Sequence, residues 1–164
     1  MKRIVFALLV ICFVIACKNQ PHDQPYQSDR EPNGGLLRMT IEGRPMHDRF
    51  FVAQFTPKGE LFETDNLQLF NYNIDSEKYP KLLISIDHLE NELKNWQKQA
   101  FPLDVFALIL EENTVPLQAK GELWIDKIDE RFIHGSFSGD LIHPENGTQF
   151  PLRGEFKAVL RYNR

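Results

Sequence analysis

The sequence predicts an all-β fold, mainly antiparallel, in the form of a β-sandwich or a partly open small barrel with one short helix. From Leu36 onward, apolar and polar residues alternate in short runs, the period of a half-buried strand. Turn signals rich in Gly, Pro and Asn separate these runs. Glycines also recur inside the C-terminal runs, where they indicate bulges or sharp bends. These interior glycines are Gly121, Gly135, Gly139 and Gly154.

Four strands are expected in the first half of the domain. Leu37, Met39 and Ile41 alternate with polar residues, and Gly43-Arg44-Pro45 then turns the chain. Each of the other three runs is short and is bounded by turn chemistry. They cover residues 50–56, 67–74 and 81–88.

Residues 89–99 interrupt the strand pattern. Leu89, Leu93 and Trp96 fall at positions i, i+4 and i+7, which lie on one face of a helix. We therefore predict one short helix in this segment, with Asp87 as its N-cap. A long loop is the alternative interpretation.

The C-terminal third has the most regular pattern. Its apolar and alternating runs predict strands over residues 105–110, 117–125, 131–142 and 150–162. A polar turn at residues 127–130 separates the second of these strands from the third. Asn146-Gly147 predicts a tight reversal before the last strand, because both residues tolerate positive φ. Residues 36–164 are thus expected to form one domain with a single core.

The first seventeen residues have the pattern of a cleaved export signal. Two basic residues precede an apolar run over residues 4–15, and a small residue precedes Cys17. The run is twelve residues long, whereas a membrane-spanning helix needs ~20. Val14-Ile15-Ala16-Cys17 resembles the lipobox of bacterial lipoproteins, which implies cleavage after residue 16 and acylation of Cys17. A plain secretory signal with an incidental Cys17 is the alternative.

Residues 17–35 are expected to be the lipidated cysteine and a flexible tether. The segment contains three prolines and two closing glycines, and Tyr26 is its only large apolar residue. Such a composition buries too little surface to offset the entropy of ordering. The expected location is the cell envelope, with the outer membrane preferred. Lys18 favours it, because Lys18 is not the acidic residue associated with inner-membrane retention in enteric bacteria. Whether the domain faces the periplasm or the outside is open.

Composition argues against several classes of function. The signal carries two of the 19 basic residues and none of the 23 acidic ones, so cleavage leaves 17 basic against 23 acidic residues and a formal charge of −6. A nucleic-acid partner is not expected, because phosphates require a basic face. The only cysteines are Cys12 and Cys17. The folded part is therefore expected to have no disulfide, cysteine nucleophile or thiolate metal site.

Three C-terminal segments share a recurrent pattern of glycines and aromatic residues. They are Gly121-Glu-Leu-Trp-Ile125, Phe132-Ile-His-Gly-Ser-Phe-Ser-Gly139 and Leu152-Arg-Gly-Glu-Phe156. Their order resembles the ending of small, uncharacterised lipoproteins of Gram-negative bacteria, and Met39-Thr-Ile-Glu-Gly-Arg-Pro45 resembles the first strand and turn of that group. The resemblance covers about half of the mature chain. It implies a β fold and carries over no catalytic residue.

No pattern in the sequence points to catalysis, a metal or a cofactor. The histidines show no i, i+2 or i, i+4 pair of the kind that binds zinc; they are His22, His47, His88, His134 and His143. The carboxylates sit mostly beside turns, as solvated acids do; the candidates are Glu111-Glu112, Asp126, Asp129-Glu130 and Asp140. Gly135-Ser-Phe-Ser-Gly139 places Phe137 where a nucleophile elbow needs serine. We expect no enzyme; an envelope glycan or peptide hydrolase with a site assembled from dispersed residues is the alternative.

Trp124 is the one aromatic residue for which the sequence predicts ligand contact. It shares the parity of Glu122 and Asp126, opposite to Leu123 and Ile125, so it is expected to face outward. The chain is thus expected to be a lipid-anchored envelope protein with a binding or structural β domain. Its partner would be another envelope protein or a small apolar or glycan ligand. An internal cavity would favour a ligand-enclosing barrel, whereas large apolar residues on the solvent-facing parity would favour docking.

Overall fold

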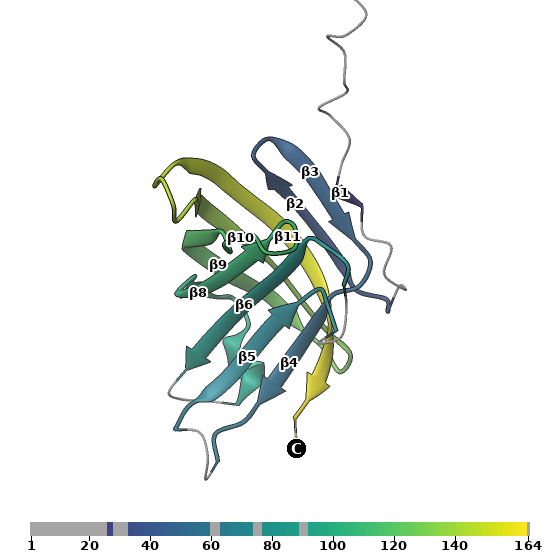
Figure 1. The fold of residues 1–164 in the computed structure, drawn as a ribbon. Coiled ribbons are helices and arrows are strands. Elements are labelled where there is room, and N and C mark those ends of the chain that lie inside the picture. The colour runs from purple at the N-terminus through teal and green to yellow at the C-terminus, as the bar shows by residue number, and fades with distance from the viewer. Residues whose placement is uncertain (1–25, 28–32, 60–62, 74–76, 89–91, 164) are drawn as a thin grey trace, which may run out of the picture.

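The computed structural model describes residues 26–27, 33–59, 63–73, 77–88 and 92–163. These residues form one strongly curled sheet, a half-barrel, which confirms the all-β prediction (Figure 1). Most neighbouring strands are antiparallel. The elements are β1 (Tyr26–Gln27), β2 (Leu36–Ile41), β3 (Arg44–Asp48), β4 (Val52–Thr56), β5 (Asp65–Phe70), β6 (Lys81–His88), η1 (Leu93–Trp96), β7 (Gln99–Pro102), β8 (Val105–Ile109), β9 (Gln118–Ile128), β10 (Phe132–Ile142) and β11 (Gln149–Tyr162). Within these ranges, no helix has the length and apolar character needed to cross a membrane.

Strand β11 connects the two sides of the curled sheet, one formed by β10, β9 and β7 and the other by β4, β5, β6 and β8. It does so because it pairs with three other strands. One edge runs antiparallel to β10 along the whole length of β10. The other edge is divided, since residues 153–157 pair with β2 and residues 159–162 pair with β4 in parallel. The sheet therefore branches at β11, toward β2, β3 and β1 on one branch and toward β4, β5, β6 and β8 on the other.

The chain also crosses between the two sides of the curl at Leu103. Strand β7, just before it, pairs with β9, and β8, just after it, pairs with β6. The Leu103 amide donates to the Gly121 carbonyl oxygen at 2.9 Å. Farther on, Leu108 and Leu117 form an antiparallel bridge with N···O distances of 2.9 and 2.8 Å. This bridge links β8 to the start of β9.

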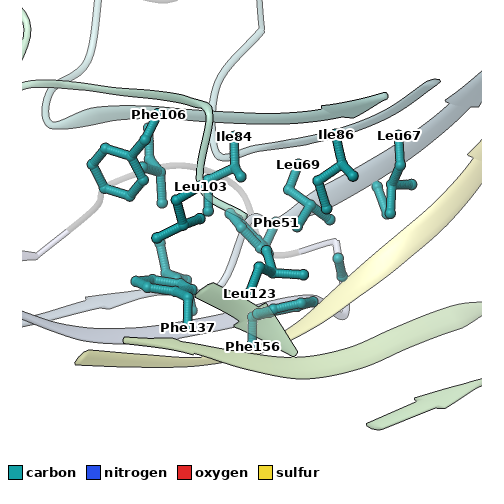
Figure 2. Packing of buried hydrophobic residues seen from close by; sticks show 14 of the residues in the cluster. Phe51, Leu67, Leu69, Ile84, Ile86, Leu103, Phe106, Leu123, Phe137 and Phe156 are labelled. Atoms are coloured by element: carbon teal, nitrogen blue, oxygen red, sulfur yellow. The ribbon is translucent and has the colours of Figure 1, made fainter. Parts of the chain in front are cut away.

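Four phenylalanines pack in series across the interior (Figure 2). The ring centroids of Phe51 and Phe156 are 5.7 Å apart, those of Phe156 and Phe137 are 6.4 Å apart, and those of Phe137 and Phe106 are 6.3 Å apart. All four rings are buried among aliphatic side chains from both sides of the curl. Side chains thus fill the space between the two sides, as they do in small barrels.

Two glycines make room for the stacked pair at the centre of this series. The β10–β11 register places Phe137 opposite Gly154 and Phe156 opposite Gly135. A Cβ atom on Gly154 would lie 2.1 Å from Cζ of Phe137, and one on Gly135 would lie 2.7 Å from Cζ of Phe156. Each ring therefore covers the glycine of the neighbouring strand. Packing alone accounts for these glycines and aromatic residues of the C-terminal pattern.

The strands β9 and β10 contain the bulge that the interior glycines predict. Their register shifts between His134 and Gly135, where β9 contributes Asp126 as one extra residue. Gly121 and Gly139 face each other across the same pair of strands. A Cβ atom on Gly121 or Gly139 would lie 2.1 or 2.0 Å, respectively, from a carbonyl oxygen of the opposite strand. The missing side chains thus allow a close backbone approach.

The helix predicted over residues 89–99 is limited to the single 3₁₀ turn η1, which buries Leu93 and Trp96. Its N-cap is Glu92, without a side-chain cap, so the predicted capping role of Asp87 is wrong; Asp87 belongs to β6. Leu89 lies outside the described residues. The helical pattern is cut short because residues 99–102 pair with β9 as strand β7, which the sequence did not predict.

Two turns also differ from the prediction. The β2–β3 hairpin turns at Glu42-Gly43, with φ of 51° and 81°, as a two-residue loop requires. Arg44-Pro45, predicted as part of the turn, instead begins β3. The β10–β11 connection is a loop over residues 143–148 rather than a two-residue reversal, and in it only Gly147 has positive φ. Within the predicted tether, Tyr26–Gln27 pair with β3.

One buried polar pair joins the ends of β3, β5 and β6. Asp48 and Asn71 are 1% and 0% exposed. The Asn71 amide nitrogen donates to Asp48 Oδ2 at 2.9 Å and to the Pro80 carbonyl at 3.0 Å, and its oxygen accepts from the Leu82 amide at 2.7 Å. Asp48 Oδ1 accepts from the Phe50 amide at 2.8 Å. Both side chains are satisfied, so this pair organises strand ends rather than an open site.

We predict that Gly154→Ala destabilises the domain by about 1–3 kcal/mol, because the added methyl group must displace the Phe137 ring in a filled core. Urea unfolding followed by tryptophan fluorescence measures the change. Gly59→Ala is the control, since the nearest heavy atom would be 3.9 Å from its Cβ. Equal unfolding midpoints for the two variants would contradict the packing account.

Asn71→Leu is expected to lower the free energy of unfolding by at least about 2 kcal/mol, because it removes a partner from the buried Asp48 and from the Leu82 amide. Thermal and urea unfolding give the loss. A cycle with Asp48→Leu tests the coupling, and the double variant should lose less than the two single losses combined. Additive losses would show that the two side chains act independently.

Candidate functional site

A groove of about 490 Å³ lies on the outer face of the sheet, over β4, β5 and β6. We call it the outer groove. Its walls combine one cation, three amide side chains and three apolar groups. The lining residues are Gln54, Gln68, Phe70, Tyr72, Asn73, Leu83 and Arg161. None of these residues is acidic, although the chain as a whole has a formal charge of −4.

Strand register brings the polar residues of the outer groove into one row. Gln54 of β4 pairs with Arg161 of β11 on one side and with Gln68 of β5 on the other. Gln68 in turn pairs with Ser85 of β6. Directly paired residues project to the same face of a sheet, so these side chains cross the outer face as a continuous polar row.

Phe70 and Tyr72 form the aromatic wall of the outer groove. They follow the outward parity of β5, and their ring centroids are 6.0 Å apart with the planes tilted by 56°. Burial raises the pKa of the Tyr72 hydroxyl. The phenol therefore remains protonated at neutral pH and keeps a hydrogen to donate. Lys81 Nζ lies 5.9 Å from the Tyr72 ring centroid.

The polar groups of the outer groove keep their hydrogen-bonding capacity. Within the ranges that the structure describes, Arg161 makes no ion pair, and Gln54 and Gln68 make no side-chain hydrogen bond. Asn66, on the same face, is by contrast bonded to Ser85 at 2.9 Å and to Asp87 at 2.7 Å. A guanidinium donates in a planar fork, and amides both donate and accept. The groove can thus hold an anion beside hydroxyl or amide groups.

Trp124 faces outward, as its parity predicts, and is 42% exposed. It pairs with Ser136 of β10 and Ala100 of β7. Strands β10 and β11 separate it from β4, so Trp124 does not line the outer groove. Ligand contact at Trp124 stays a prediction.

A second hollow, of about 400 Å³, lies between the β8–β9 and β10–β11 loops, and His143 is part of its wall. His143 Nε2 is 2.6 Å from Oε1 of Glu42 in the β2–β3 turn. Of the described residues that line this hollow, only Thr114 carries a hydroxyl group. Its oxygen donates to the Glu111 carbonyl at 2.8 Å. The His143–Glu42 pair thus joins two hairpins that are distant in sequence.

Asp129 shapes the turn between β9 and β10. Its Oδ1 accepts from the Arg131 amide at 3.0 Å and from the Phe132 amide at 2.9 Å. Lys127 Nζ and His134 Nε2 lie 3.6 and 3.7 Å from its Oδ2. The hydrogen bond from the Arg131 amide has the largest effect on the pKa of Asp129 and lowers it. Desolvation, the second-largest effect, raises this pKa. The Phe132 amide, Lys127 and His134 lower it further, so the net shift is downward. This carboxylate has a local structural role.

The other residues considered from the sequence do not converge on a site. His47 and Asp140 lie on different strands, and Glu111-Glu112 lie in an exposed loop. In the described part of the chain, no three His, Cys, Asp or Glu residues are placed to hold a metal ion. The predicted signal over residues 1–16, Cys17 and His22 lie outside the described residues, and His88 is described only as part of β6.

Sequence reasoning missed the outer groove, although part of the signal was present. The alternation over residues 67–74 already places Gln68, Phe70 and Tyr72 on one face. The parallel pairing of Arg161 with Gln54 left no such signal, because it joins segments over 100 residues apart. Comparison with protein family models, curated proteins and solved structures gives no match for this chain.

We predict that the β9–β10 turn loses stability in acid. The pKa of Asp129 is lower in the folded state than its ordinary value of 3.8. Its stabilising effect is therefore complete above that value and is lost as the pH falls through the lowered folded pKa. A carboxyl-carbon NMR titration measures the folded pKa, and Asp129→Asn should remove this acid dependence. A midpoint at or above the ordinary value would contradict the turn geometry.

Proposed function

We propose that this chain is a lipid-anchored bacterial envelope protein whose β domain binds a ligand, without catalysis, at the outer groove. The polar row of Arg161, Gln54 and Gln68 beside an aromatic wall carries the proposal. These side chains present one cation and two amides, and within the described residues none of the three groups is bonded to another side chain. Sites for small ligands combine apolar walls with a few convergent polar groups, and their volumes are about 300–1,000 Å³.

The packing of the interior favours an external site over an enclosed one. Phe51, Phe106, Phe137 and Phe156 occupy the space between the two sides of the curl (Figure 2). A small apolar ligand carried inside the half-barrel would have to displace them. A ligand at the outer groove meets no such cost.

The membrane anchor in this proposal rests on the sequence. The lipobox-like string ends at Cys17, and an acylated cysteine with several chains provides durable attachment. Because Tyr26–Gln27 pair with β3, the tether in this proposal is the preceding segment, residues 18–25. A mixed coil of that length would place the domain on the order of 15 Å from the lipid. Confinement at this distance raises the effective concentration of the groove for ligands at the same membrane. The outer membrane is the proposed location.

A hydrolase is the second candidate, because His143 and Glu42 lie at hydrogen-bond distance beside the second hollow. A carboxylate that orients an imidazole is a recurrent arrangement in acid–base catalysis. The nucleophile or second acid would have to come from outside this pair. The hydroxyl of Thr114 is bonded within its own turn, so the binding role at the outer groove is preferred.

The experiment is copurification of the full-length protein from native envelopes, read by mass spectrometry. Cys17→Ala should move the protein from the membrane to the soluble fraction. Arg161→Gln combined with Gln68→Ala should leave it in the membrane but deplete the bound ligand. Arg153→Gln is the matched control, because Arg153 is an exposed arginine of β11 that does not line the groove.

Each part of the proposal has an outcome that contradicts it. Membrane retention of Cys17→Ala would contradict the anchor. A ligand retained equally by the groove variant and by Arg153→Gln would contradict the site. Turnover of an envelope glycan or peptide that stops in His143→Ala would favour the second candidate.

A further inference from the structure

We infer that the ligand of the outer groove is a glycan that carries a carboxylate; this inference rests on the proposed function. The position of the groove limits what can bind, because it lies on the face of the sheet. The strand residues that line it, Gln54, Gln68 and Leu83, each have a paired strand on both sides. A peptide that binds as an added strand needs a free edge. A ligand on the face meets side chains instead.

The side chains that face this ligand suit a sugar. Phe70 and Tyr72 present two tilted rings 6.0 Å apart, and such rings pack against the C–H face of a pyranose. The hydroxyls at the rim of the sugar ring both donate and accept hydrogen bonds. Gln54 and Gln68, adjacent in the polar row, provide amide donors and acceptors to match them.

The charge of the groove selects an acidic sugar. Arg161 lies at one end of the polar row and makes no ion pair within the described ranges. Lys81 lies beside Tyr72, at 5.9 Å from its ring centroid, and adds positive charge near the aromatic wall. A guanidinium holds a carboxylate through two parallel hydrogen bonds, in a geometry that lysine cannot reproduce. We therefore assign Arg161 to the carboxylate and the glutamines to the hydroxyls.

The test is isothermal titration calorimetry with the full-length protein in detergent micelles. The probes are tetrasaccharides of galacturonic acid and of glucuronic acid, each paired with its methyl ester, which removes the charge and keeps the hydroxyls. We expect an acid form to bind at least about tenfold more tightly than its ester, because charge-assisted hydrogen bonds are stronger than neutral ones. Arg161→Gln should weaken the acid form to the level of the ester and leave the ester unchanged.

Two further variants separate the role of Arg161 from a general loss of the site. Arg153→Gln should bind like the parent protein. Gln68→Ala should weaken the acid and the ester by a similar factor, because the amide faces hydroxyls in both. Far-ultraviolet circular dichroism and the unfolding midpoint confirm that each variant is folded.

The outcomes that would overturn the inference are distinct from those that would overturn the proposed function. Equal affinity for acid and ester, or equal affinity for a tetraglutamate peptide, would exclude an acidic glycan as the preferred ligand. The absence of binding by all four sugar probes would also overturn it. If a ligand still copurified in a groove-dependent manner, the proposed function would stand without the glycan.

Discussion

The reciprocal packing of Phe137 over Gly154 and of Phe156 over Gly135 is the contact on which the rest of the structure depends. It fits only one register of β10 against β11, because a slip of either strand by one residue would turn the ring of that strand to the outer face. The same rings contact Phe106 from β8 and Phe51 beside β4. One pair of cross-strand contacts thus sets the register on one side of the curl and joins it to the other side.

The outer groove inherits its geometry from this core contact. Strand β11 carries Phe156 on its inner face and Arg161, five residues later, on its outer face. The rings fix the register of β11 against β10. They thereby also fix the register in which residues 159–162 pair with β4. Arg161 consequently comes level with Gln54 and Gln68. The outer groove and the hydrophobic core therefore lie on the two faces of the same strand pairing, and a change at Gly154 affects both.

Local patterns in the sequence predicted those parts of the fold that depend on local order. The long alternating runs of β9, β10 and β11, the bulge near Gly135 and the outward face of Trp124 all follow from residue type and parity. Strands β3 and β7 were not predictable in this way. Pro45 is a turn former in isolation, but its strand pairs with β2. Gln99 is the last residue of the predicted helix, but it pairs with β9 as part of β7. In both cases tertiary pairing overrides the local preference.

The candidate site was less predictable than the fold for the same physical reason. Parity alone groups Gln68, Phe70 and Tyr72, yet it does not show which strand lies beside them. Arg161 comes beside these residues through a parallel pairing with Gln54. No hairpin turn joins the two strands, so the sequence holds no local signal for this pairing. The His143–Glu42 contact likewise joins two separate hairpins. A site whose residues come from strands distant in sequence can therefore be recognised only when the strand pairing is known.

The position of β11 in the sheet has a consequence for biosynthesis. This strand follows β2, β4 and β10 in the sequence, and all three pair with it (Figure 1). During synthesis, β2, β4 and β10 therefore emerge from the ribosome before this shared partner, and their pairing with it must wait until β11 has emerged. The two sides of the sheet are thus joined only late in synthesis, and until then the edges of β4 and β10 that β11 later covers have no partner strand.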